Sequence, residues 1–284
     1  MTRSNKDRIP TPPSAGAPPE VNPANPVAAP PDPMATLQFI VPTEIVDLPS
    51  KGQFYPAGHP LHQCETIEVR HLTAKEEDIL TSPTLLKKGL ALDRMLQSVI
   101  VDKTIKIEDL LVGDKNALLV HSRIFGYGAN YNTTIICPAC GNDFENTFDL
   151  SEIENKEVNT QLDQYGIETT ENNTFLITLP RSNYTVEFRL LTSRDEVAAM
   201  GTSKEMTSLK LLQTITVSVN DQQDHFFIKR ALSSLPIIDA SILKRAYAAA
   251  TPDVNLVQHA TCPHCAETSE VGVPLDAGFF WPQL

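Results

Sequence analysis

The sequence lacks the short motifs that mark the commonest enzyme classes. It contains no G-x-S-x-G elbow, no Walker A loop, no G-x-G-x-x-G and no H-E-x-x-H. Each of these patterns places a nucleophile, a phosphate or a metal-bound water where catalysis needs it. In their absence we identify no catalytic residue, and we expect that the protein is not an enzyme.

Basic residues and long apolar runs are also scarce. The chain has 23 lysines and arginines against 35 aspartates and glutamates, which gives a formal net charge of −12. This deficit disfavours general binding to nucleic acid and to anionic membranes, because both depend on Lys and Arg contacts to phosphate. No apolar run approaches the length of a membrane span. We therefore expect no nucleic acid among the partners and no membrane span.

Cysteine is rare too, with five residues, but four of them stand in two C-P-x-C knuckles. The first knuckle holds Cys137 and Cys140, and the second holds Cys262 and Cys265. Paired knuckles supply the four thiolates of a tetrahedral zinc site. The gap between them is much longer than in a self-contained zinc ribbon, so one ion would tie two distant parts of the chain together. Four thiolates leave no position for an activated water, which indicates a structural ion.

Histidines near the cysteines offer alternative ligands. His259 and His264 lie close to the ligands of the second knuckle and could replace a sulfur. A side chain between two ligands, as His264 is, usually points outward, so we favour four cysteines and no histidine. The remaining cysteine, Cys64, has three histidines near it in the sequence: His59, His62 and His71. That group is compatible with a nucleophile or a second metal site, but a buried or loop thiol is the simpler interpretation.

Short stretches of sequence recur in the same order along the chain. They pair Ile67–Thr73 with Val186–Thr192, Gln97–Val101 with Gln213–Val217, Asp114 and Leu118 with Asp239 and Leu243, and the first knuckle with the second. The last two pairs share one offset, and the others differ from it by a few residues, as changes in loop length would produce. We interpret the pattern as two structural repeats, each donating one knuckle. The alternative is a single domain with accidental similarity.

Each repeat predicts the same order of elements. An alternating strand comes first, followed by a T-x-x-[DE] capping box at Thr73–Glu76 and at Thr192–Asp195. An amphipathic helix follows, then a second helix from about Asp114 or Asp239, and then a knuckle at the tip of a β-hairpin. The predicted fold class is α+β, with two strand–helix–helix–knuckle repeats that share one zinc-ribbon-like site.

Composition divides the chain into four parts. Residues 1–36 hold ten of the 22 prolines and are expected to form a disordered or extended arm, because they bury too little apolar surface to offset their ordering entropy. Repeat one is expected over residues 37–150. Residues 151–183 are expected to form an acidic linker and a first strand region. Residues 184–284 are expected to form repeat two with an aromatic tail.

Two aromatic segments are not needed to complete the order of elements that the two predicted repeats share. One is Phe54–Tyr55, in a run dense in Pro and Gly, and the other is the tail Phe279–Trp281. Surplus aromatic side chains are good anchors for an interface, but they can equally close a core. The sequence leaves both alternatives open.

Several blocks resemble a known family. They are Val41–Leu61, Leu72–Leu80 and Leu110–Ala117, together with a knuckle followed by Pro274 and Phe279–Phe280. In these blocks the chain resembles the T4-type bacteriophage baseplate protein family, over roughly residues 37 to 284. The first block is the most specific, whereas the knuckles alone would identify nothing. One departure is Ala266, which stands where the first knuckle has Gly141. Glycine eases a left-handed turn, so the second knuckle is expected to be strained or differently shaped.

The resemblance implies a structural or assembly protein of the baseplate hub in a contractile-tailed phage. Its partners would be other baseplate or hub subunits, and no catalytic residue is implied. We expect it in the host cytoplasm during assembly, where thiols stay reduced. The sequence leaves open whether it then stays in the tail baseplate of the virion or acts only during assembly. The alternative is a zinc-ribbon protein that binds nucleic acid, but acidic residues around the knuckles would repel phosphate.

Overall fold

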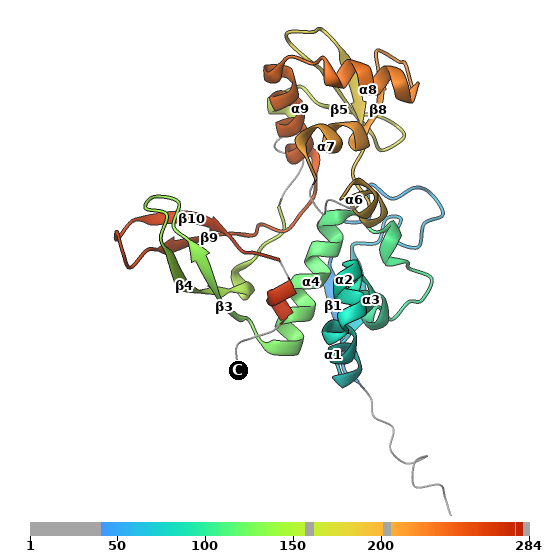
Figure 1. Ribbon diagram of the computed structural model, residues 1–284. Coiled ribbons are helices and arrows are strands. Elements are labelled where there is room, and N and C mark those ends of the chain that lie inside the picture. The colour runs from blue at the N-terminus through green and yellow to red at the C-terminus, as the bar shows by residue number, and fades with distance from the viewer. Residues whose placement is uncertain (1–40, 157–161, 201–205, 276, 281–284) are drawn as a thin grey trace, which may run out of the picture. The chain divides into compact units, whose positions relative to one another are not determined.

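Helices and short antiparallel sheets alternate along the part of the chain that the structure describes. The structure is a computed structural model, and it describes residues 41–156, 162–200, 206–275 and 277–280. Its strands form three two-stranded sheets and one four-stranded sheet in the order β5-β6-β7-β8 (Figure 1). This mixed content confirms the predicted α+β class. The predicted Pro-rich arm, residues 1–36, lies outside the described residues.

The first segment, residues 41–150, begins with one β-hairpin and ends with the hairpin that carries the first knuckle. Its elements are β1 (Thr43–Asp47), β2 (Thr66–Arg70), α1 (Ala74–Thr81), α2 (Pro83–Lys88), α3 (Ala91–Val99), η1 (Ile107–Asp109), α4 (Val112–Tyr127), β3 (Asn130–Ile136) and β4 (Asp143–Asp149). After α3, Ile100 makes an antiparallel bridge to Val69 of β2. The chain after α3 therefore continues the β1–β2 sheet for one residue.

The second segment, residues 168–273, follows the short helices η2 (Leu150–Glu152) and η3 (Asp163–Tyr165). Its elements are β5 (Glu168–Thr169), β6 (Phe175–Thr178), β7 (Thr185–Phe188), α6 (Ser193–Met200), α7 (Ser208–Ile215), β8 (Thr216–Val219), α8 (His225–Ser233), α9 (Ile237–Ala250), β9 (Val257–Thr261) and β10 (Thr268–Gly272). Phe188 of β7 pairs with Thr216 of β8. Because β6 pairs with β7, β6 belongs to the sheet of this segment, although it lies within the region 151–183.

A buried carboxylate holds the Pro- and Gly-rich loop of the first segment. Asp114, the third residue of α4, is fully buried and accepts hydrogen bonds from the Ser50 backbone N–H at 3.0 Å and the Ser50 hydroxyl at 2.6 Å. The Tyr55 hydroxyl donates to the same carboxylate at 2.7 Å and accepts from the Leu111 N–H at 3.1 Å. Burial, and then the Asp114 charge, raise the pKa of Tyr55. This aromatic residue therefore belongs to the core and not to an exposed anchor.

A second buried carboxylate has the same place in the second segment. Asp239 is the third residue of α9, and its side chain accepts the backbone N–H groups of Arg181 at 3.1 Å and Ser182 at 2.7 Å. In each segment, the carboxylate binds the turn next to the backbone hydrogen bond that closes a pair of antiparallel strands. That bond runs from Leu48 N to Glu65 O in one hairpin, and from Leu179 N to Tyr184 O in the other.

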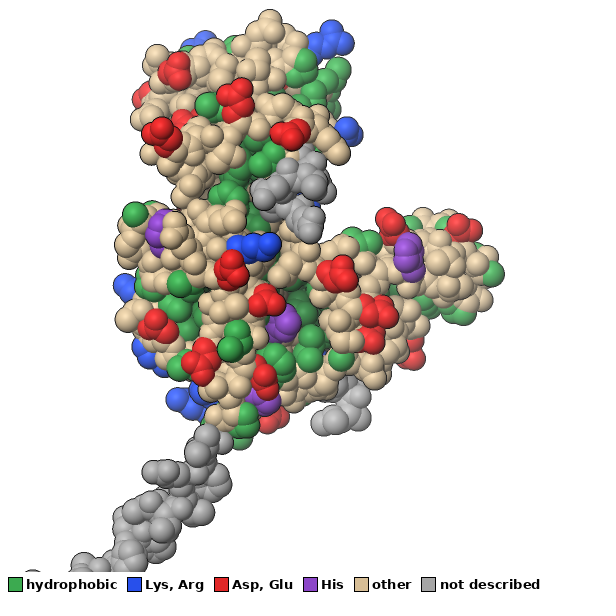
Figure 2. Space-filling view, turned by 180° about the vertical axis from the view of Figure 1, so that it is seen from behind, with side chains coloured by type: hydrophobic (Ala, Val, Ile, Leu, Met, Phe, Trp, Pro, Cys, Tyr) green, Lys and Arg blue, Asp and Glu red, His purple; other side chains and the backbone are tan. Residues whose placement is uncertain are grey.

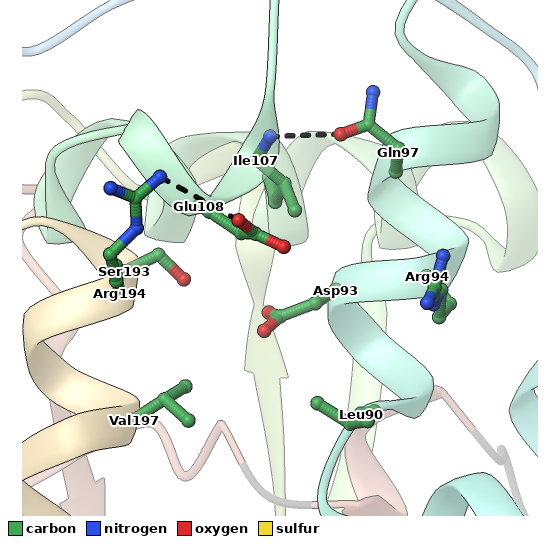
Figure 3. Close-up of a pocket in the computed structure, with 9 residues that line it drawn as sticks. All are labelled: Leu90, Asp93, Arg94, Gln97, Ile107, Glu108, Ser193, Arg194 and Val197. Carbon is green, nitrogen blue, oxygen red and sulfur yellow. Dashed lines mark hydrogen bonds and ion pairs between the residues drawn. The ribbon is translucent and has the colours of Figure 1, made fainter.

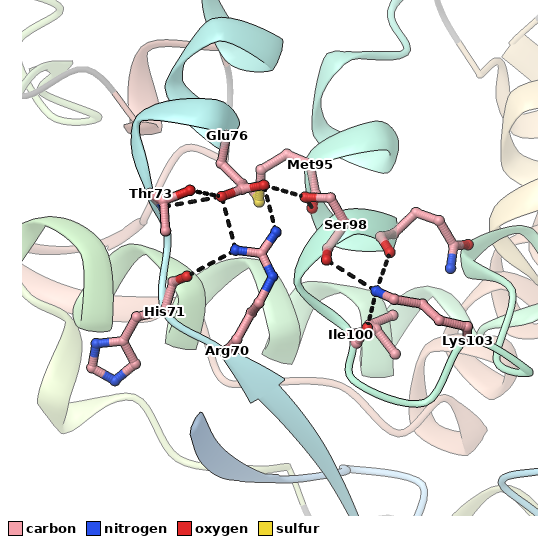
Figure 4. Close-up of polar contacts among 9 residues, drawn as sticks. Arg70, His71, Thr73, Glu76, Met95, Ser98, Ile100 and Lys103 are labelled. Atoms are coloured by element: carbon pink, nitrogen blue, oxygen red, sulfur yellow. Dashed lines mark hydrogen bonds and ion pairs between the residues drawn. The ribbon is translucent and has the colours of Figure 1, made fainter. Parts of the chain in front are cut away.

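An arginine and a carboxylate fix the turn from strand to helix in the first segment (Figure 4). Arg70, at the end of β2, donates to both oxygens of Glu76 at 2.6 and 3.0 Å. The Thr73 N–H and hydroxyl donate to the same carboxylate, which confirms the predicted capping box, and Ser98 donates to it from α3. Burial raises the pKa of Glu76, but these hydrogen bonds outweigh burial and lower it to about 2.

The corresponding turn of the second segment is built in the same way. Arg189, after β7, donates to both oxygens of Asp195 at 2.6 and 2.9 Å. The N–H and hydroxyl of Thr192 donate to the same carboxylate at 3.1 and 2.9 Å. Burial raises the pKa of Asp195, and the Arg189 and Thr192 hydrogen bonds more than offset it, lowering that pKa to about 2.

The two segments meet where α4 and α6 begin. Leu111 and Thr192 form an antiparallel β-bridge, in which Val112 N donates to Leu191 O and Ser193 N donates to Leu110 O. Beside the bridge the ammonium of Lys115 lies 2.9 Å from Asp93 and 3.3 Å from Glu196. A cavity of about 230 Å³ lies between α3, η1 and α6 at this contact, and Arg194 and Glu108 form an ion pair on its wall (Figure 3).

The aromatic tail packs against α4. Phe279 and Phe280, in η5 (Ala277–Phe280), are each 1% exposed. The buried guanidinium of Arg123 donates to the carbonyl oxygens of Phe279, Gly128 and Asn130 at 2.8, 2.7 and 3.1 Å. For these two phenylalanines the core alternative is therefore the right one, whereas Trp281 lies outside the described residues.

We predict that Glu76→Gln and Asp195→Asn each destabilise the protein at pH 7. Each variant should also lose less of its free energy of unfolding than the parent does as the pH falls. A carboxylate whose folded pKa is lowered stabilises the fold above its unfolded pKa, near 4.5 for Glu76 and 3.8 for Asp195. That contribution, about 2–3 kcal/mol each, is lost as the pH falls toward 2. Urea unfolding from pH 7 to pH 2 measures it.

The control for this prediction is Glu77→Gln, because Glu77 is exposed on the same helix as Glu76. It should leave the stability at pH 7 within about 0.5 kcal/mol of the parent. Equal effects of the three substitutions would contradict the assignment.

Candidate metal centre

Each knuckle closes a two-stranded hairpin, as the sequence predicts. In the first, Ile136 pairs with Asp143, and the turn is held by hydrogen bonds from Cys137 N to Asn142 O and from Gly141 N to Cys137 O. In the second, β9 and β10 end in the pair Thr261 and Thr268. Its turn has matching bonds from Cys262 N to Glu267 O and from Ala266 N to Cys262 O, and all four bonds are 2.9 Å long.

The structure brings the four knuckle sulfurs together. Cys137 Sγ lies 3.7 Å from Cys265 Sγ, and Cys140 Sγ lies 3.8 Å from Cys262 Sγ. All four sulfur atoms lie within 4.8 Å of one another. A disulfide would require about 2.05 Å between sulfurs, whereas the edge of a tetrahedron with metal–sulfur distances of about 2.3 Å is about 3.8 Å. The donor set and its spacing therefore fit one tetrahedral metal ion.

The hairpins also touch away from the sulfurs. The side-chain amide of Gln258 on β9 donates to the carbonyl of Asp149 on β4 at 2.6 Å. His264 Nε2 lies 3.3 Å from the carbonyl of Asp143. Figure 1 shows the two hairpins side by side. The two hairpins are thus held together by contacts besides those of the sulfurs. Within the cluster, Cys137 and Cys262 are buried, whereas Cys140 and Cys265 are exposed.

Backbone donors prepare one thiol of the cluster for ionisation. The N–H of Cys140, and after it the N–H of Ala139, lower the pKa of Cys137 to about 7. The Glu267 N–H acts in the same direction on Cys265, but burial and the neighbouring sulfurs outweigh it and raise the pKa of Cys265 to about 12. Four thiolates so close together repel one another, so full ionisation of the cluster requires a cation.

Of the histidines near the cysteines, His264 and His59 have other partners, and His259 does not belong to the metal-binding group. His264 is exposed and faces the Asp143 carbonyl, not the sulfurs. Cys64 donates to the carbonyl of Pro60 at 3.4 Å, and the ring of His59 stacks on Tyr55. Among the His, Cys, Asp and Glu side chains of the described residues, the four knuckle cysteines form the one group of three or more that is placed to share a metal ion.

The family of the chain follows from a comparison with family models. The model described as "T4 bacteriophage base plate protein" matches residues 41–281. Since the match spans most of the chain, the chain belongs to this family, and the predicted resemblance is confirmed. No curated protein and no solved structure matches the chain. Among the described helices, none has the length and apolar character needed to cross a membrane.

We predict that glycine is needed in the first knuckle and would be tolerated in the second. Gly141 and Ala266 occupy the same turn position with φ of 76° and 59°. A Cβ at Gly141 would meet no atom within 4 Å, so Gly141→Ala tests the backbone alone and should cost about 1–2 kcal/mol.

Ala266→Gly relieves the same strain, offset by about 0.5–1 kcal/mol of glycine entropy, and should be neutral or slightly stabilising. Thermal unfolding of both variants in one buffer measures the difference. A stabilising Gly141→Ala, or an Ala266→Gly as costly as its counterpart, would contradict the shared left-handed geometry.

Proposed function

We propose that this member of the T4 bacteriophage base plate family is a structural or assembly protein of the baseplate hub in a contractile tail. It would act through contacts with other baseplate or hub subunits, in the host cytoplasm during assembly and then in the virion. The observation that carries the proposal is the family match, which spans residues 41–281 and so nearly all of the described chain. The proposal assigns the protein no catalytic residue.

The four knuckle cysteines hold one structural zinc ion in this proposal. The sulfur separations of 3.7 and 3.8 Å support it, because they are close to the tetrahedral edge of a four-sulfur zinc site. Zinc would neutralise the thiolates of Cys137, Cys140, Cys262 and Cys265 and lock the two hairpins together. A shell of four sulfurs is closed, so the ion would serve the fold and not a reaction.

The finer part of the proposal is that the two segments are repeats of one unit. Three pairs of equivalent contacts support it. Asp114 and Asp239 stand at the third residue of α4 and α9, where each binds the turn of a hairpin. The Arg70–Glu76 and Arg189–Asp195 pairs fix equivalent turns. The bridges Val69–Ile100 and Phe188–Thr216 pair the residues that the sequence matches equate.

The acidic surroundings of the knuckles favour a protein partner over nucleic acid. Exposed carboxylates line both hairpins near the sulfurs: Asp143, Glu145 and Glu267. Such a surface repels phosphate, whereas nucleic-acid-binding ribbons carry Lys and Arg there. The proposed role is therefore architectural, with zinc keeping two distant stretches of chain in register.

We predict that Cys262→Ser removes the metal and destabilises the fold. Elemental analysis of the purified parent should find about one zinc per chain, since four thiolates make one site. The variant should bind little zinc and unfold at a clearly lower temperature, because metal binding energy becomes folding energy. The matched control is Cys64→Ser, which alters the one cysteine outside the cluster. It should keep the zinc.

Two zinc ions per chain, or a Cys262→Ser variant that retains full occupancy, would contradict the four-cysteine site. A parent chain that purifies without zinc and gains no stability when zinc is added would do the same.

The hub role is tested by co-expressing the tagged full chain with the hub subunits of its own phage. We expect hub subunits to purify with it, and we expect mass spectrometry of purified virions to show whether it stays in the finished particle. If no baseplate subunit is captured while the chain binds DNA or RNA on filters at moderate salt, the nucleic-acid alternative replaces this proposal.

A further inference from the structure

Strand β1 of the first segment has one edge that no other described strand covers. Its other edge pairs with β2, and the bonds at the two ends of this pair run from His71 N to Pro42 O and from Leu48 N to Glu65 O. Successive residues of a strand point their N–H and C=O groups to opposite sides, so the even-numbered residues of β1 face β2. The residues that face away are Thr43, Ile45 and Asp47. Their backbone groups have no hydrogen-bond partner among the described residues.

An open edge alone identifies no partner, because many sheets end in one. The second segment shows what the equivalent edge holds. In the proposed repeat β2 corresponds to β7, so their partners β1 and β6 correspond as well, and Ile45 corresponds to Leu176. The outer edge of β6 is covered by β5, an antiparallel strand in which Glu168 pairs with Leu176. The sheet of the first segment therefore lacks the strand that completes the sheet of the second.

The chain before β1 cannot repeat the turn that leads from β5 to β6. In that turn the Asn173 N–H donates to the Thr170 carbonyl at 3.2 Å, and Asn173 has a φ of 58°. The counterpart of Asn173 in the proposed repeat is Pro42. Proline has no N–H, and its ring holds φ near about −65°. Neither the hydrogen bond nor the left-handed conformation can form at Pro42, so a strand at this edge has to arrive by another route.

Burial agrees with a missing strand at the edge of β1. Ile45 is 71% exposed, whereas its counterpart Leu176 is half-buried. Thr43 and its counterpart Thr174 are the same type of residue, yet Thr43 is exposed and Thr174 is buried. In contrast, Val46 on the opposite face of β1 is fully buried. The core side of β1 is thus complete, and what the strand lacks lies along its edge and its outer face.

Helix α4 makes a second copy of this chain a poor occupant of the edge. It packs against β1 on the core side. Burial lowers the pKa of His121 on α4, and the nearby charge of Asp47 on β1 opposes that effect. A second β1 added antiparallel to this edge would bring its own α4 to the same face. Neighbouring strands lie only about 4.8 Å apart, whereas packed helices need about 8–10 Å between their axes. An isolated strand such as β5 brings no helix with it.

We propose that an extended segment of a neighbouring baseplate subunit adds to the edge of β1 as an antiparallel strand. The inference rests on the proposed function, together with the proposed repeat, and specifies how the partner is bound. The N–H and C=O groups of Thr43, Ile45 and Asp47 pair with those of the segment. Main-chain bonds of this kind give affinity, and the side chains beside them give specificity. The segment has no proline at the paired positions, because proline cannot donate.

Charge adds a preference for a basic segment. The outer face of the β1–β2 sheet carries the exposed acidic residues Asp47 and Glu68, and neither has an ion-pair partner among the described residues. Arg70 on the same face is bound by Glu76, and the exposed Lys51 lies in the loop beyond the strand. Figure 2 shows Asp and Glu side chains spread among hydrophobic ones on the face that it draws. A lysine or arginine opposite Asp47 stabilises the pair, and binding weakens as salt is raised.

One substitution blocks the edge without removing a hydrogen bond of the fold. Ile45→Pro deletes the central N–H, which points away from β2, and proline is tolerated on an edge strand where its nitrogen faces solvent. Ile45→Thr keeps the donor and the branched side chain, and it is the matched control. Ile45→Lys is a second blocking variant, for use if Ile45→Pro unfolds, because a lysine on an edge opposes strand pairing.

Capture of hub subunits is the first measurement, with the tagged full chain co-expressed with the hub subunits of its own phage. The parent and Ile45→Thr should capture the same subunit in equal amounts. Ile45→Pro should capture about tenfold less, because one hydrogen bond is lost and the ring obstructs the added strand. Equal capture by a folded Ile45→Pro overturns this proposal and leaves the hub role standing. A parent that captures no baseplate subunit overturns both.

Hydrogen exchange at single amides then tests the geometry. In the isolated full chain at low concentration, the amides of Glu44 and Val46 should exchange slowly, because they face β2, and those of the edge should exchange fast. In the captured complex the edge amides should become slow while Glu44 and Val46 change little. The edge amides are those of Thr43, Ile45 and Asp47.

Three results of the exchange measurement would overturn the proposal. Edge amides that are already slow in the isolated chain would show that the chain fills its own edge. Slowing that follows the concentration of this chain alone would assign the edge to a second copy. Edge amides that stay fast in the captured complex would show that the partner binds elsewhere, in which case the hub role stands without the added strand.

Discussion

The meeting of the two knuckles is the constraint on which the rest of the chain depends. A two-stranded hairpin is marginal by itself in water, and here two of them bring together sulfurs that are separated by 122 and 128 residues in sequence. Closing so long a loop is costly in chain entropy, and a metal bond is well suited to offset that cost. The same return of the chain brings Phe279 to Arg123 on α4. The cluster of four knuckle cysteines and the packed Phe279–Phe280 tail thus connect the middle of the chain to its C-terminal part.

Within that frame, buried carboxylates position the connections between strands and helices. Asp114 and Asp239 each bind a hairpin turn, and Glu76 and Asp195 each bind an arginine and a threonine. Networks of this kind are favourable only when their donors and acceptors are paired, and they then select a single arrangement of the loops around them. They explain how a protein with small sheets can hold its connecting loops in fixed positions.

Local features of the fold could be predicted from the sequence, whereas most long-range contacts could not. The capping box at Thr73–Glu76 and the knuckle hairpins depend on neighbouring residues, so their patterns are visible in the chain. The role of Arg123 is not, because its partners are backbone carbonyls, which carry no signature in the sequence. The Tyr55–Asp114 hydrogen bond joins residues 59 positions apart. The cysteine cluster is the long-range exception, and it could be predicted because its four cysteines form two knuckles at one offset.

The most direct test of a metal site shared by the two knuckles is X-ray absorption at the zinc edge of the purified full-length protein. One zinc ion bound by Cys137, Cys140, Cys262 and Cys265 predicts a first shell of four sulfurs at about 2.3 Å, with no lighter ligand. A shell that contains nitrogen or oxygen, or a second metal within a few ångströms, would contradict a single site shared by the two knuckles.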